Sequence, residues 1–366
     1  MAGGAVDGET LAERLARARA RAARALTGHG LRGAAEMLAT IPADVEMDRY
    51  GDGGVVARLE AEVAALVGKE AALFFPSGTM AQQAALRVHA DRRGRRGVVF
   101  HPACHLDWHE GRGYERLHGL FGVPAGALRR PLSLADLEGV AEAPAALLIE
   151  LPQRDLGGTL PALADLLAQV EWAQRKGAAA HMDGARLWEA TPFYGLSPAA
   201  IAAPFDTLYV SFYKGLGAIT GSCLAGPADL LREAALWRQR MGGRLFGLWP
   251  YAASALAGLR ERLPRMPLYY EHARAIAAAL RDLPGVRVMP DPPQAPMMHI
   301  QMAVEPDALA AGALAIAERE GVWTFPAPFA VDAPGLLRVE LSVGEATLSF
   351  APQEVRGLVA ELAGLA

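Results

Sequence analysis

The chain has 366 residues, of which 52% are hydrophobic, so it can bury one large core and a second, smaller one. Its formal net charge is −4, and it has no uncharged apolar run of the roughly 18 residues that span a membrane, which argues against nucleic acid or a membrane as a partner. The two cysteines, Cys104 and Cys223, form neither a disulfide framework nor a metal-binding pattern and suit the reducing cytoplasm.

The first predicted element is a helix within residues 1–27, which are rich in arginine and alanine. Leucines and alanines recur there at helical spacing, and Thr27-Gly28 would cap the end of the helix. An arginine-rich start is also typical of a transit peptide. Acidic residues within the segment favour a helix of the mature protein instead.

Short apolar runs then alternate with helical patterns. Because this alternation is typical of βαβ units, it predicts an α/β protein with a parallel sheet and helices on both faces. The runs lie at residues 70–75, 97–100, 145–151, 178–182 and 206–213.

The character of the sequence changes near residue 262, where prolines cluster before a long helical pattern. Strands are expected beyond it, around residues 285–303 and 336–342. This pattern predicts a smaller C-terminal domain. The expected divisions of the chain are an N-terminal helical segment at 1–27, a large domain at 28–261 and a small domain at 262–366.

Polar residues follow the predicted strands at the points where the strands end. In an open parallel sheet, ligands bind beyond the carboxyl ends of the strands. The sequence therefore predicts one crevice that receives side chains from five strands. In chain order, these residues are Ser77-Gly78-Thr79, His105, Gln153 and Arg154, Asp183 and Arg186, and Lys214.

Lys214 is one of only three lysines among the 36 lysine and arginine residues. It follows an apolar run and precedes G-L-G-A-I-T-G, a context unlike that of a surface lysine. An amine in a dry pocket loses its charge readily and attacks aldehydes, which a guanidinium cannot do. The sequence therefore predicts that the site needs an amine at this position and not merely a positive charge.

Two further motifs indicate what such an amine would hold. Ser77, Gly78 and Thr79 begin a predicted helix, where free N–H groups attract a phosphate, although serine is also an ordinary helix cap. Asp183 ends an apolar strand, and a buried carboxylate needs a cation, which is either a ligand or Arg186. An aldehyde that carries a phosphate and a ring nitrogen suited to a carboxylate is pyridoxal 5′-phosphate, with no metal required.

Four segments together resemble the threonine aldolase and β-eliminating lyase group of fold-type I pyridoxal-phosphate enzymes. The resemblance runs from about residue 45 to 260 and continues more faintly to the end. Its most specific part is H-x-D-G-A-R followed by K-G-L-G. The segments are D-R-Y-G-D-G (48–53), L-E-A-E-V-A-A-L-V-G-K-E-A-A-L-F-F-P-S-G-T-M-A-Q (59–82), H-M-D-G-A-R-L (181–187) and Y-K-G-L-G-A-I-T-G-S-C-L-A-G (213–226).

The resemblance implies an aspartate aminotransferase-like α/β fold. This fold has a mostly parallel seven-stranded sheet with helices on both faces, and a smaller C-terminal α/β domain. It also implies a homodimer or homotetramer with shared active sites, in which Tyr50-Gly51-Asp52 reaches across to a neighbouring subunit.

The same resemblance implies how the cofactor is bound. Lys214 would form the Schiff base with pyridoxal 5′-phosphate, and Asp183 would pair with its ring nitrogen. The phosphate would be held by Ser77, Gly78 and Thr79.

Substrate contacts follow from the same resemblance. His105 matches a histidine that stacks on the cofactor ring near the substrate hydroxyl, and Glu110 matches the acid five residues on. Arg186 and Arg338 match arginines that grip the substrate carboxylate, a bidentate task that suits a planar guanidinium. Gln153 stands where the family has a histidine near the β-substituent. Two alternatives stay open: His105 as a core histidine, and Arg338 as a surface ion pair.

The activity implied is retro-aldol cleavage of an L-β-hydroxy-α-amino acid of the threonine type to glycine and an aldehyde. His105 is the candidate base, because imidazole titrates near neutral pH. Gln153 cannot serve as a base, so the alternative is a β-eliminating lyase in which Lys214 removes the α-proton and the products are ammonia and a 2-oxo acid. Transaminase or racemase activity, and a fold kept only as a binding subunit, are further alternatives. The retained lysine and aspartate disfavour a role as a binding subunit alone.

Overall fold

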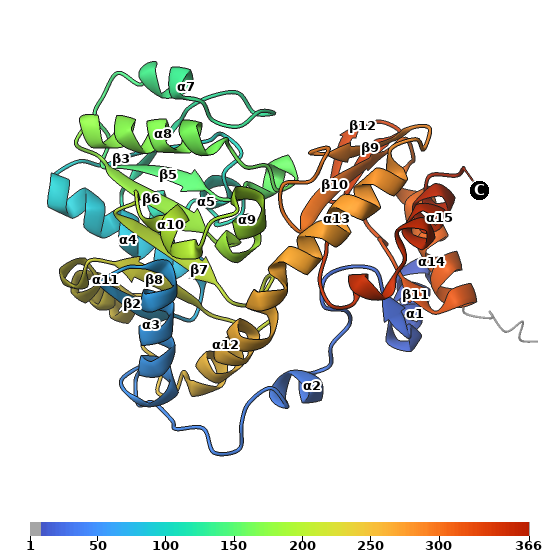
Figure 1. Ribbon diagram of the computed structural model, residues 1–366, viewed down its shortest axis with the longest axis horizontal. Helices are drawn as coiled ribbons and strands as arrows, with labels where there is room; N and C mark the ends of the chain where they lie inside the picture. The colour runs from blue at the N-terminus through green and yellow to red at the C-terminus, as the bar shows by residue number, and fades with distance from the viewer. Residues whose placement is uncertain (1–8, 366) are drawn as a thin grey trace, which may run out of the picture. The chain divides into compact units, whose positions relative to one another are not determined.

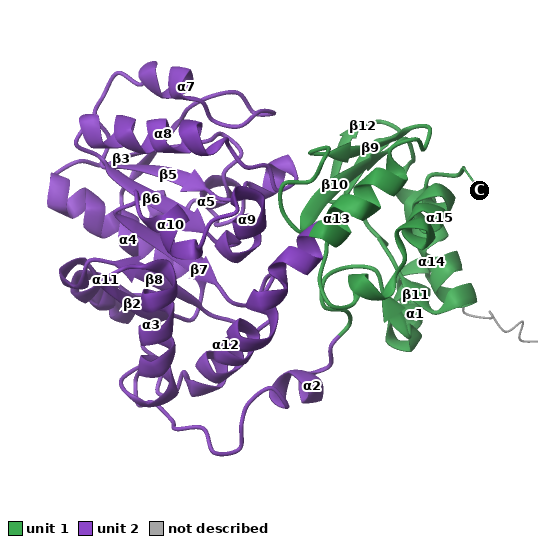
Figure 2. Cartoon of the chain, viewed as in Figure 1, with its two compact units in different colours: residues 1–31, 271–366 green, residues 32–270 purple. Residues whose placement is uncertain are grey.

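The computed structural model describes residues 9–365, so residues 1–8 of the predicted N-terminal segment lie outside it. The described chain forms two compact units (Figure 2). Residues 32–270 make up the larger unit, and the smaller unit combines residues up to 31 with those from 271 onward. The structure thus divides the chain after residues 31 and 270, where the sequence predicts divisions after 27 and 261.

The larger unit is built on a seven-stranded sheet (Figure 1). Its strands are β2 (Ala71–Phe75), β3 (Gly97–Phe100), β4 (Phe121–Pro124), β5 (Ala146–Glu150), β6 (Ala179–Gly184), β7 (Thr207–Ser211) and β8 (Ser222–Gly226). Their order is β2-β8-β7-β6-β5-β3-β4. β8 pairs antiparallel with β7 and β2, and the other pairings are parallel, so every strand but β8 runs in one direction. The predicted mostly parallel seven-stranded sheet is confirmed.

Helices cover both faces of this sheet. The helices of the larger unit are α2 (Ala34–Leu38), α3 (Gly54–Val67), α4 (Gly78–Arg93), α5 (His105–Trp108), α6 (Gly113–Arg116), α7 (Leu134–Glu138), α8 (Leu163–Arg175), α9 (Leu187–Tyr194), α10 (Pro198–Ala202), α11 (Ala228–Arg240) and α12 (Trp249–Arg262), with short 3-10 turns at Arg154–Leu156 and Leu263–Arg265. α4 and α11 share one apolar cluster with Phe75 and Tyr209. Phe74 points to the opposite face, because side chains alternate along a strand, and its backbone N–H donates to Glu60 of α3 at 2.7 Å.

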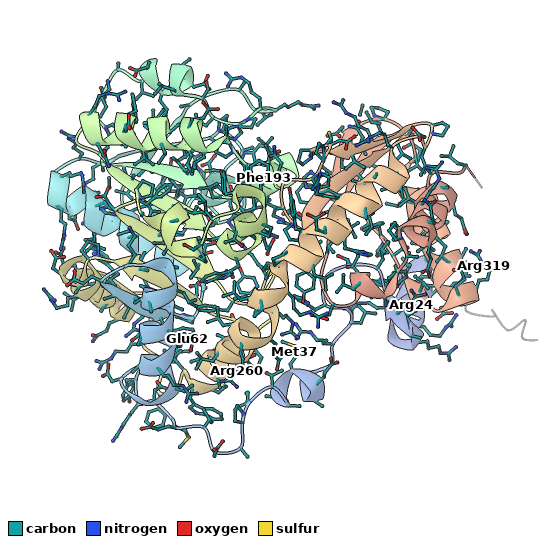
Figure 3. The ribbon with its side chains drawn as sticks, viewed as in Figure 1. Arg24, Met37, Glu62, Phe193, Arg260 and Arg319 are labelled. Carbon is teal, nitrogen blue, oxygen red and sulfur yellow. The ribbon has the colours of Figure 1, made fainter. Side chains whose placement is uncertain are left out.

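The smaller unit contains a four-stranded antiparallel sheet and a two-stranded parallel pair. Its elements are α1 (Leu11–Arg21), β1 (Arg24–Ala25), α13 (Met266–Leu280), β9 (Val286–Met289), β10 (Met297–Met302), α14 (Pro306–Glu320), β11 (Val322–Trp323), β12 (Ala330–Ala333), β13 (Leu336–Ser342), a 3-10 turn (Thr347–Ser349) and α15 (Pro352–Leu362), with α13 starting just before the boundary. Arg24, labelled in Figure 3, pairs with Glu354 of α15 at 2.6 Å. The N-terminal elements are thus tied to the C-terminal ones.

The predicted N-terminal helix is longer than the real one, and its predicted cap is wrong. α1 ends at Arg21, well before Thr27-Gly28. Ala23 N–H donates to Gly321 O at 2.9 Å, and β1 pairs parallel with β11. Leu26, which follows β1, is fully buried. Strand pairing and burial within the smaller unit therefore override the local helix propensity of this segment.

Residues 9–365 contain no helix that is long and apolar enough to span a membrane. Over the same range, no three His, Cys, Asp or Glu side chains are grouped so as to hold a metal ion. Cys104 and Cys223 are both buried free thiols.

Candidate active site

The residues predicted to share one edge of the large sheet do follow its strands. Ser77 comes after β2, His105 after β3, Gln153 after β5 and Lys214 after β7, while Asp183 lies near the end of β6. The strands that carry them all run in the same direction. The carboxyl ends of these strands therefore present the predicted side chains along a single edge.

Lys214 lies in the turn between β7 and β8 and is half-buried. Burial, followed by the nearby charge of Arg186, lowers the pKa of Lys214 to about 8, although the charge of Asp183 opposes the shift. The other two lysines donate to backbone carbonyls, Lys69 to Phe205 O at 2.6 Å and Lys176 to Val140 O at 3.2 Å. Burial lowers the pKa of Lys69 as well, but Lys214 is the lysine that follows β7 at the sheet edge, where a neutral amine can act as a nucleophile.

Asp183 is 1% exposed and is held by two donors. Its Oδ1 accepts from Ala185 N at 3.1 Å, and its Oδ2 accepts from Gln82 Nε2 at 3.0 Å. Gln82, from α4, is fully buried. The sequence signal for Gln82 was a glutamine pair in an otherwise apolar stretch of helix, and the prediction did not use it.

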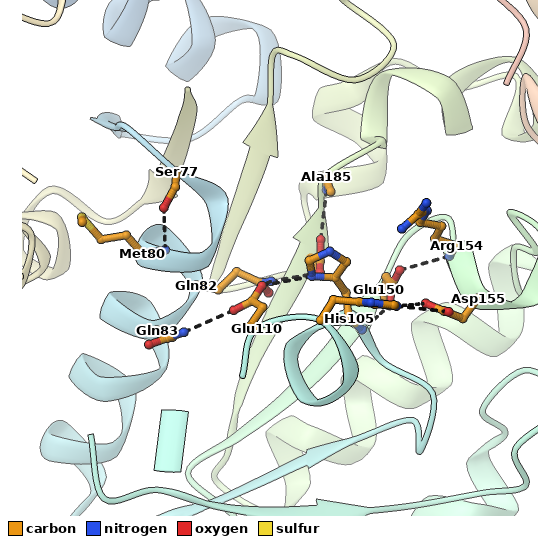
Figure 4. Close-up of polar contacts among 12 residues, drawn as sticks. Ser77, Met80, Gln82, Gln83, His105, Glu110, Glu150, Arg154, Asp155 and Ala185 are labelled. Carbon is orange, nitrogen blue, oxygen red and sulfur yellow. Dashed lines mark hydrogen bonds and ion pairs between the residues drawn. The ribbon is translucent and has the colours of Figure 1, made fainter. Parts of the chain in front are cut away.

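His105 and Glu110 extend this network (Figure 4). Glu110 Oε1 lies 3.2 Å from His105 Nδ1 and accepts from Gln82 Nε2 at 3.1 Å. Burial lowers the pKa of His105, but the hydrogen bond to Glu110 and the charge of Asp183 outweigh it, so the pKa lies above its ordinary value. A continuous chain of hydrogen bonds therefore runs from His105 through Glu110 and Gln82 to Asp183.

Glu150, at the end of β5, is a site residue that the prediction did not single out. Its side chain accepts from the backbone N–H groups of His105 and Arg154, each at 3.0 Å (Figure 4). Glu150 pairs in register with Asp183 on the neighbouring strand. Burial, and then the charge of Asp183, raise the pKa of Glu150 to about 7. This carboxyl group fixes the two loops that follow β3 and β5.

Arg186 contacts Glu189 rather than Asp183. Arg186 Nε lies 3.5 Å from Glu189 Oε2, and Glu189 Oε1 accepts from Gly215 N at 3.0 Å. A Cβ at position 215 would come within 2.3 Å of Glu189 Oε1. A glycine after Lys214 is therefore required for this close approach, and Glu189 links the Arg186 side chain to the lysine turn.

Ser77 and Gly78 form the start of α4. Ser77 Oγ accepts from Met80 N at 3.3 Å, so Ser77 is the helix cap that the sequence allowed for (Figure 4). A Cβ at Gly78 would come within 2.7 Å of the Tyr209 ring. Gly78 thus lets the helix N-terminus, with Thr79 in its first turn, approach the Tyr209 ring of β7 closely.

A second histidine lies beside His105. The imidazole ring centroids of His105 and His109 are 5.0 Å apart. His109 Nε2 lies 3.0 Å from Asp155 Oδ2 and 3.2 Å from Asp155 Oδ1. The prediction missed this pair, although His109 follows His105 by one helical turn.

Comparison with known proteins then places the chain. The family model described as β-eliminating lyase matches residues 31–303. The chain belongs to the β-eliminating lyase family. Its fold is that of fold-type I pyridoxal-phosphate enzymes, as the resemblance implied.

Relatives of this lyase chain include several proteins named as threonine aldolases. The low-specificity L-threonine aldolase 1 of Arabidopsis thaliana is 32% identical over 258 residues, which cover 67% of this chain and 71% of the relative. A solved structure from Listeria monocytogenes EGD-E, assigned as an L-allo-threonine aldolase, is 37% identical with a TM-score of 0.89, covering 97% of this chain and 99% of that one. One from Exiguobacterium sp. 255-15, assigned as an aromatic amino acid β-eliminating lyase/threonine aldolase, is 36% identical with a TM-score of 0.90, covering 96% and 100%.

The residues at the sheet edge fit the cofactor that the lyase family implies. Lys214 offers an amine of lowered pKa to an aldehyde. Asp183 offers a buried carboxylate to a protonated ring nitrogen. The close-packed start of α4 at Ser77-Gly78 offers N–H groups to a phosphate. The donor set is therefore compatible with pyridoxal 5′-phosphate.

Gln153 of this lyase chain is 6% exposed. Gln153 Nε2 lies 2.5 Å from His101 Nδ1 and 3.4 Å from Ala103 O. His101 Nε2 in turn faces the carbonyl oxygens of Ala127 and Arg130, at 3.1 and 2.9 Å. These contacts hold Gln153 against the loop that follows β3, and its contact with substrate stays a prediction.

Arg338 belongs to the smaller unit, on β13. Its Nε lies 2.9 Å from Asp332 Oδ2, and its NH1 group lies 3.1 Å from His299 Nδ1. The ion-pair alternative for Arg338 is therefore present within that unit. Its partner Asp332 is itself 7% exposed at the side chain, so the guanidinium is held in a fixed orientation.

Proposed function

We propose that this chain is a pyridoxal-phosphate-dependent aldolase that cleaves an L-β-hydroxy-α-amino acid of the threonine type to glycine and an aldehyde. The observation that carries this proposal is the placement of Lys214, Asp183 and His105 on one sheet edge, with the lysine pKa lowered to about 8. The names of the relatives from Arabidopsis and Listeria support the choice of substrate class.

In this proposal, Lys214 and Asp183 are the two residues that would hold the reactive groups of the cofactor. The Lys214 amine would hold its aldehyde group, and the Asp183 carboxylate, kept in place by Gln82, would keep its ring nitrogen protonated. Ser77, Gly78 and Thr79 bind the phosphate at the start of α4. When bound, the cofactor draws electrons away from the α-carbon of an amino acid.

Arg186 and Arg338 are the proposed ligands of the substrate carboxylate. Each guanidinium is already oriented by a carboxylate, Arg186 by Glu189 and Arg338 by Asp332. A guanidinium held in this way loses little freedom when it forms a bidentate pair. Both arginines would orient the amino acid so that its Cα–Cβ bond is the one that breaks.

β-Elimination is the second candidate function. The family description and the assignment of the Exiguobacterium protein both include it. Lys214, with a pKa of about 8, would then remove the α-proton, and the products would be ammonia and a 2-oxo acid.

We place the protein in the cytoplasm, because its two cysteines are buried free thiols. We also propose a homodimer or homotetramer. An exposed apolar surface, here called the Tyr50 patch and made of Met47, Tyr50, Leu245 and Phe246, supports this proposal. Clustered exposed apolar side chains mark sites of protein association.

Product analysis tests the proposed function. The purified protein is incubated with L-threonine, L-allo-threonine and, as a substrate for elimination, L-serine. Glycine together with acetaldehyde is expected from the first two. Ammonia with a 2-oxo acid, and no glycine, would replace the aldolase by the lyase, whereas no product from any of the three would contradict both functions.

A further inference from the structure

His109 has none of the functions proposed above for the residues of the candidate site. His109 directly follows α5, and its ring lies beside that of His105 with centroids 5.0 Å apart and planes at 45°. The charges that act on His105 include those of Asp183 and Lys214. His105 therefore lies at the candidate active site, and His109 is its immediate neighbour.

The contact with Asp155 fixes which nitrogen of His109 carries a proton. An ionised carboxylate only accepts hydrogen bonds, so Nε2, which faces both Asp155 oxygens at 3.0 and 3.2 Å, must be the donor. In the neutral imidazole the lone pair then lies on Nδ1. No hydrogen bond to His109 Nδ1 is found within residues 9–365.

Burial distinguishes the two members of the pair. The Asp155 side chain is 4% exposed, whereas 34% of the His109 side chain is exposed. The buried carboxylate holds Nε2, while about a third of the His109 side chain is open to solvent. An imidazole oriented by a buried carboxylate, with its second nitrogen open, is the arrangement of a general base.

His105 is less suited to that task. Its Nδ1 belongs to the chain of hydrogen bonds that runs through Glu110 and Gln82 to Asp183, and its pKa lies above its ordinary value, which favours the imidazolium form that cannot accept a proton. Gln153 is turned towards His101 and has no basic group. Of these neighbouring side chains, His109 is the imidazole held by a carboxylate outside that chain of hydrogen bonds.

We propose that His109 is the base that takes the β-hydroxyl proton of the substrate, and that Asp155 is a positioning residue that holds its ring. This inference rests on the proposed aldolase function. In the step, the O–H bond breaks as an N–H bond forms at His109 Nδ1, and the oxygen pair becomes the new C=O bond. The electrons of the Cα–Cβ bond stay on Cα, which takes up a proton to give glycine. One proton leaves the β-hydroxyl oxygen and one is added at Cα, so the overall step balances.

The first test compares two reactions of the holoenzyme. His109→Gln is expected to lower kcat/KM for L-threonine cleavage by about 10²–10⁴-fold, the usual contribution of a general base. Exchange of the α-proton of glycine in D₂O, followed by NMR, needs no β-hydroxyl and is expected to be unchanged. Retained exchange also shows that the variant is folded.

The second test measures which nitrogen of the His109 ring carries a proton. Imidazole ¹⁵N shifts of the full-length protein are expected to show His109 protonated at Nε2 and not at Nδ1. Asp155→Asn should mix the two tautomers and lower kcat more than it changes KM. The matched controls are Asp107→Asn and His272→Gln. Asp107 is a carboxylate of α5 that accepts from Tyr114 at 2.7 Å, and His272 lies in the smaller unit. Both substitutions should leave the ¹⁵N shifts of His109 unchanged.

Three outcomes would overturn or separate these ideas. Full cleavage activity in His109→Gln, with loss in His105→Gln, would make His105 the base. A His109 proton on Nδ1 in the wild type would also overturn the role of His109. A wild-type protein that releases no glycine from any β-hydroxy amino acid would instead contradict the proposed aldolase function. Failure of the aldolase function can therefore be told apart from failure of the role of His109.

Discussion

Lys214 combines reactivity with a cost in stability. Its pKa of about 8 means that the folded protein disfavours the charged amine. The unfolded chain, by contrast, solvates that charge freely. A residue that destabilises the fold in this way is typical of a functional site.

Replacing Lys214 with methionine is therefore expected to stabilise the cofactor-free protein by on the order of 2 kcal/mol at pH 7 while abolishing turnover. The folded pKa lies below the ordinary value of about 10.4, so the penalty is present below pH 8 and fades as pH rises towards 10.4. Urea denaturation at pH 7 and pH 10 measures this change.

Lys176→Met is the control for this experiment. Because the Lys176 amine donates to Val140 O at 3.2 Å, its loss should destabilise the protein rather than stabilise it. An unchanged stability of Lys214→Met at pH 7, or a gain that grows with pH, would contradict the argument.

Gln82 holds two carboxylates at once, and its removal should affect both. Gln82→Leu leaves Asp183 Oδ2 and Glu110 Oε1 without this donor. The expected loss in the free energy of unfolding is about 2 kcal/mol, with weaker cofactor binding measured by equilibrium dialysis. Gln83→Leu is the matched control, since Gln83 donates to Glu110 at 3.4 Å and forms no hydrogen bond with Asp183 within the described chain. Equal losses in both variants would argue against the special position of Gln82.

The candidate site was predictable where residues sit at strand ends and less so elsewhere. Lys214, Asp183 and His105 follow apolar runs, and the direction of the strands brings them to one edge. Gln82 comes from the second turn of a helix, and Asp155 from a 3-10 turn. Their positions depend on how whole elements pack, which no local pattern encodes.

At the scale of elements, the start of α4 depends on the absence of a side chain. Gly78→Ala would place a Cβ 2.7 Å from the Tyr209 ring, and the expected cost is about 1–3 kcal/mol. Because the helix N-terminus must then shift, the affinity for pyridoxal 5′-phosphate should also fall. Chemical denaturation and cofactor titration measure the two effects.

Gly357→Ala, in α15, provides the opposite case. Nothing lies within 4 Å of a Cβ at this position, so alanine should stabilise the helix by about 0.5–1 kcal/mol. If Gly78→Ala were as stable as the parent protein, the close approach of α4 to β7 would not matter for folding.

Elements were predictable where burial and hydrophobic pattern agree. β3 and β7 are continuous apolar runs and match the prediction closely. β4 was missed because it is a partly exposed edge strand with a glycine and a proline, and β8 because its residues are small and follow a glycine turn. β1 was read as helix because its pairing partner, β11, lies near the other end of the sequence.

At the scale of the whole molecule, the Tyr50 patch predicts association. Phe246 is 65% exposed and Met47 66% exposed, and the Tyr50 and Phe246 rings meet edge to face with centroids 5.3 Å apart. Phe246→Glu is expected to reduce the molar mass in sedimentation equilibrium. Leu117→Glu is the control, because Leu117 is 67% exposed but lies outside the patch, and it should leave the mass unchanged. A parent protein that sediments as a monomer would refute the oligomer.

The order of elements along the chain has a consequence for synthesis. β1 pairs with β11, yet residues 32–270 form their own compact unit between them. On a ribosome, β1 therefore emerges first and must wait, unpaired, until the whole intervening unit has been translated. Nascent chains stalled after residue 270 should contain a protease-resistant larger unit, with α1 and β1 still open to cleavage. The smaller unit closes only when the last part of the chain leaves the exit tunnel.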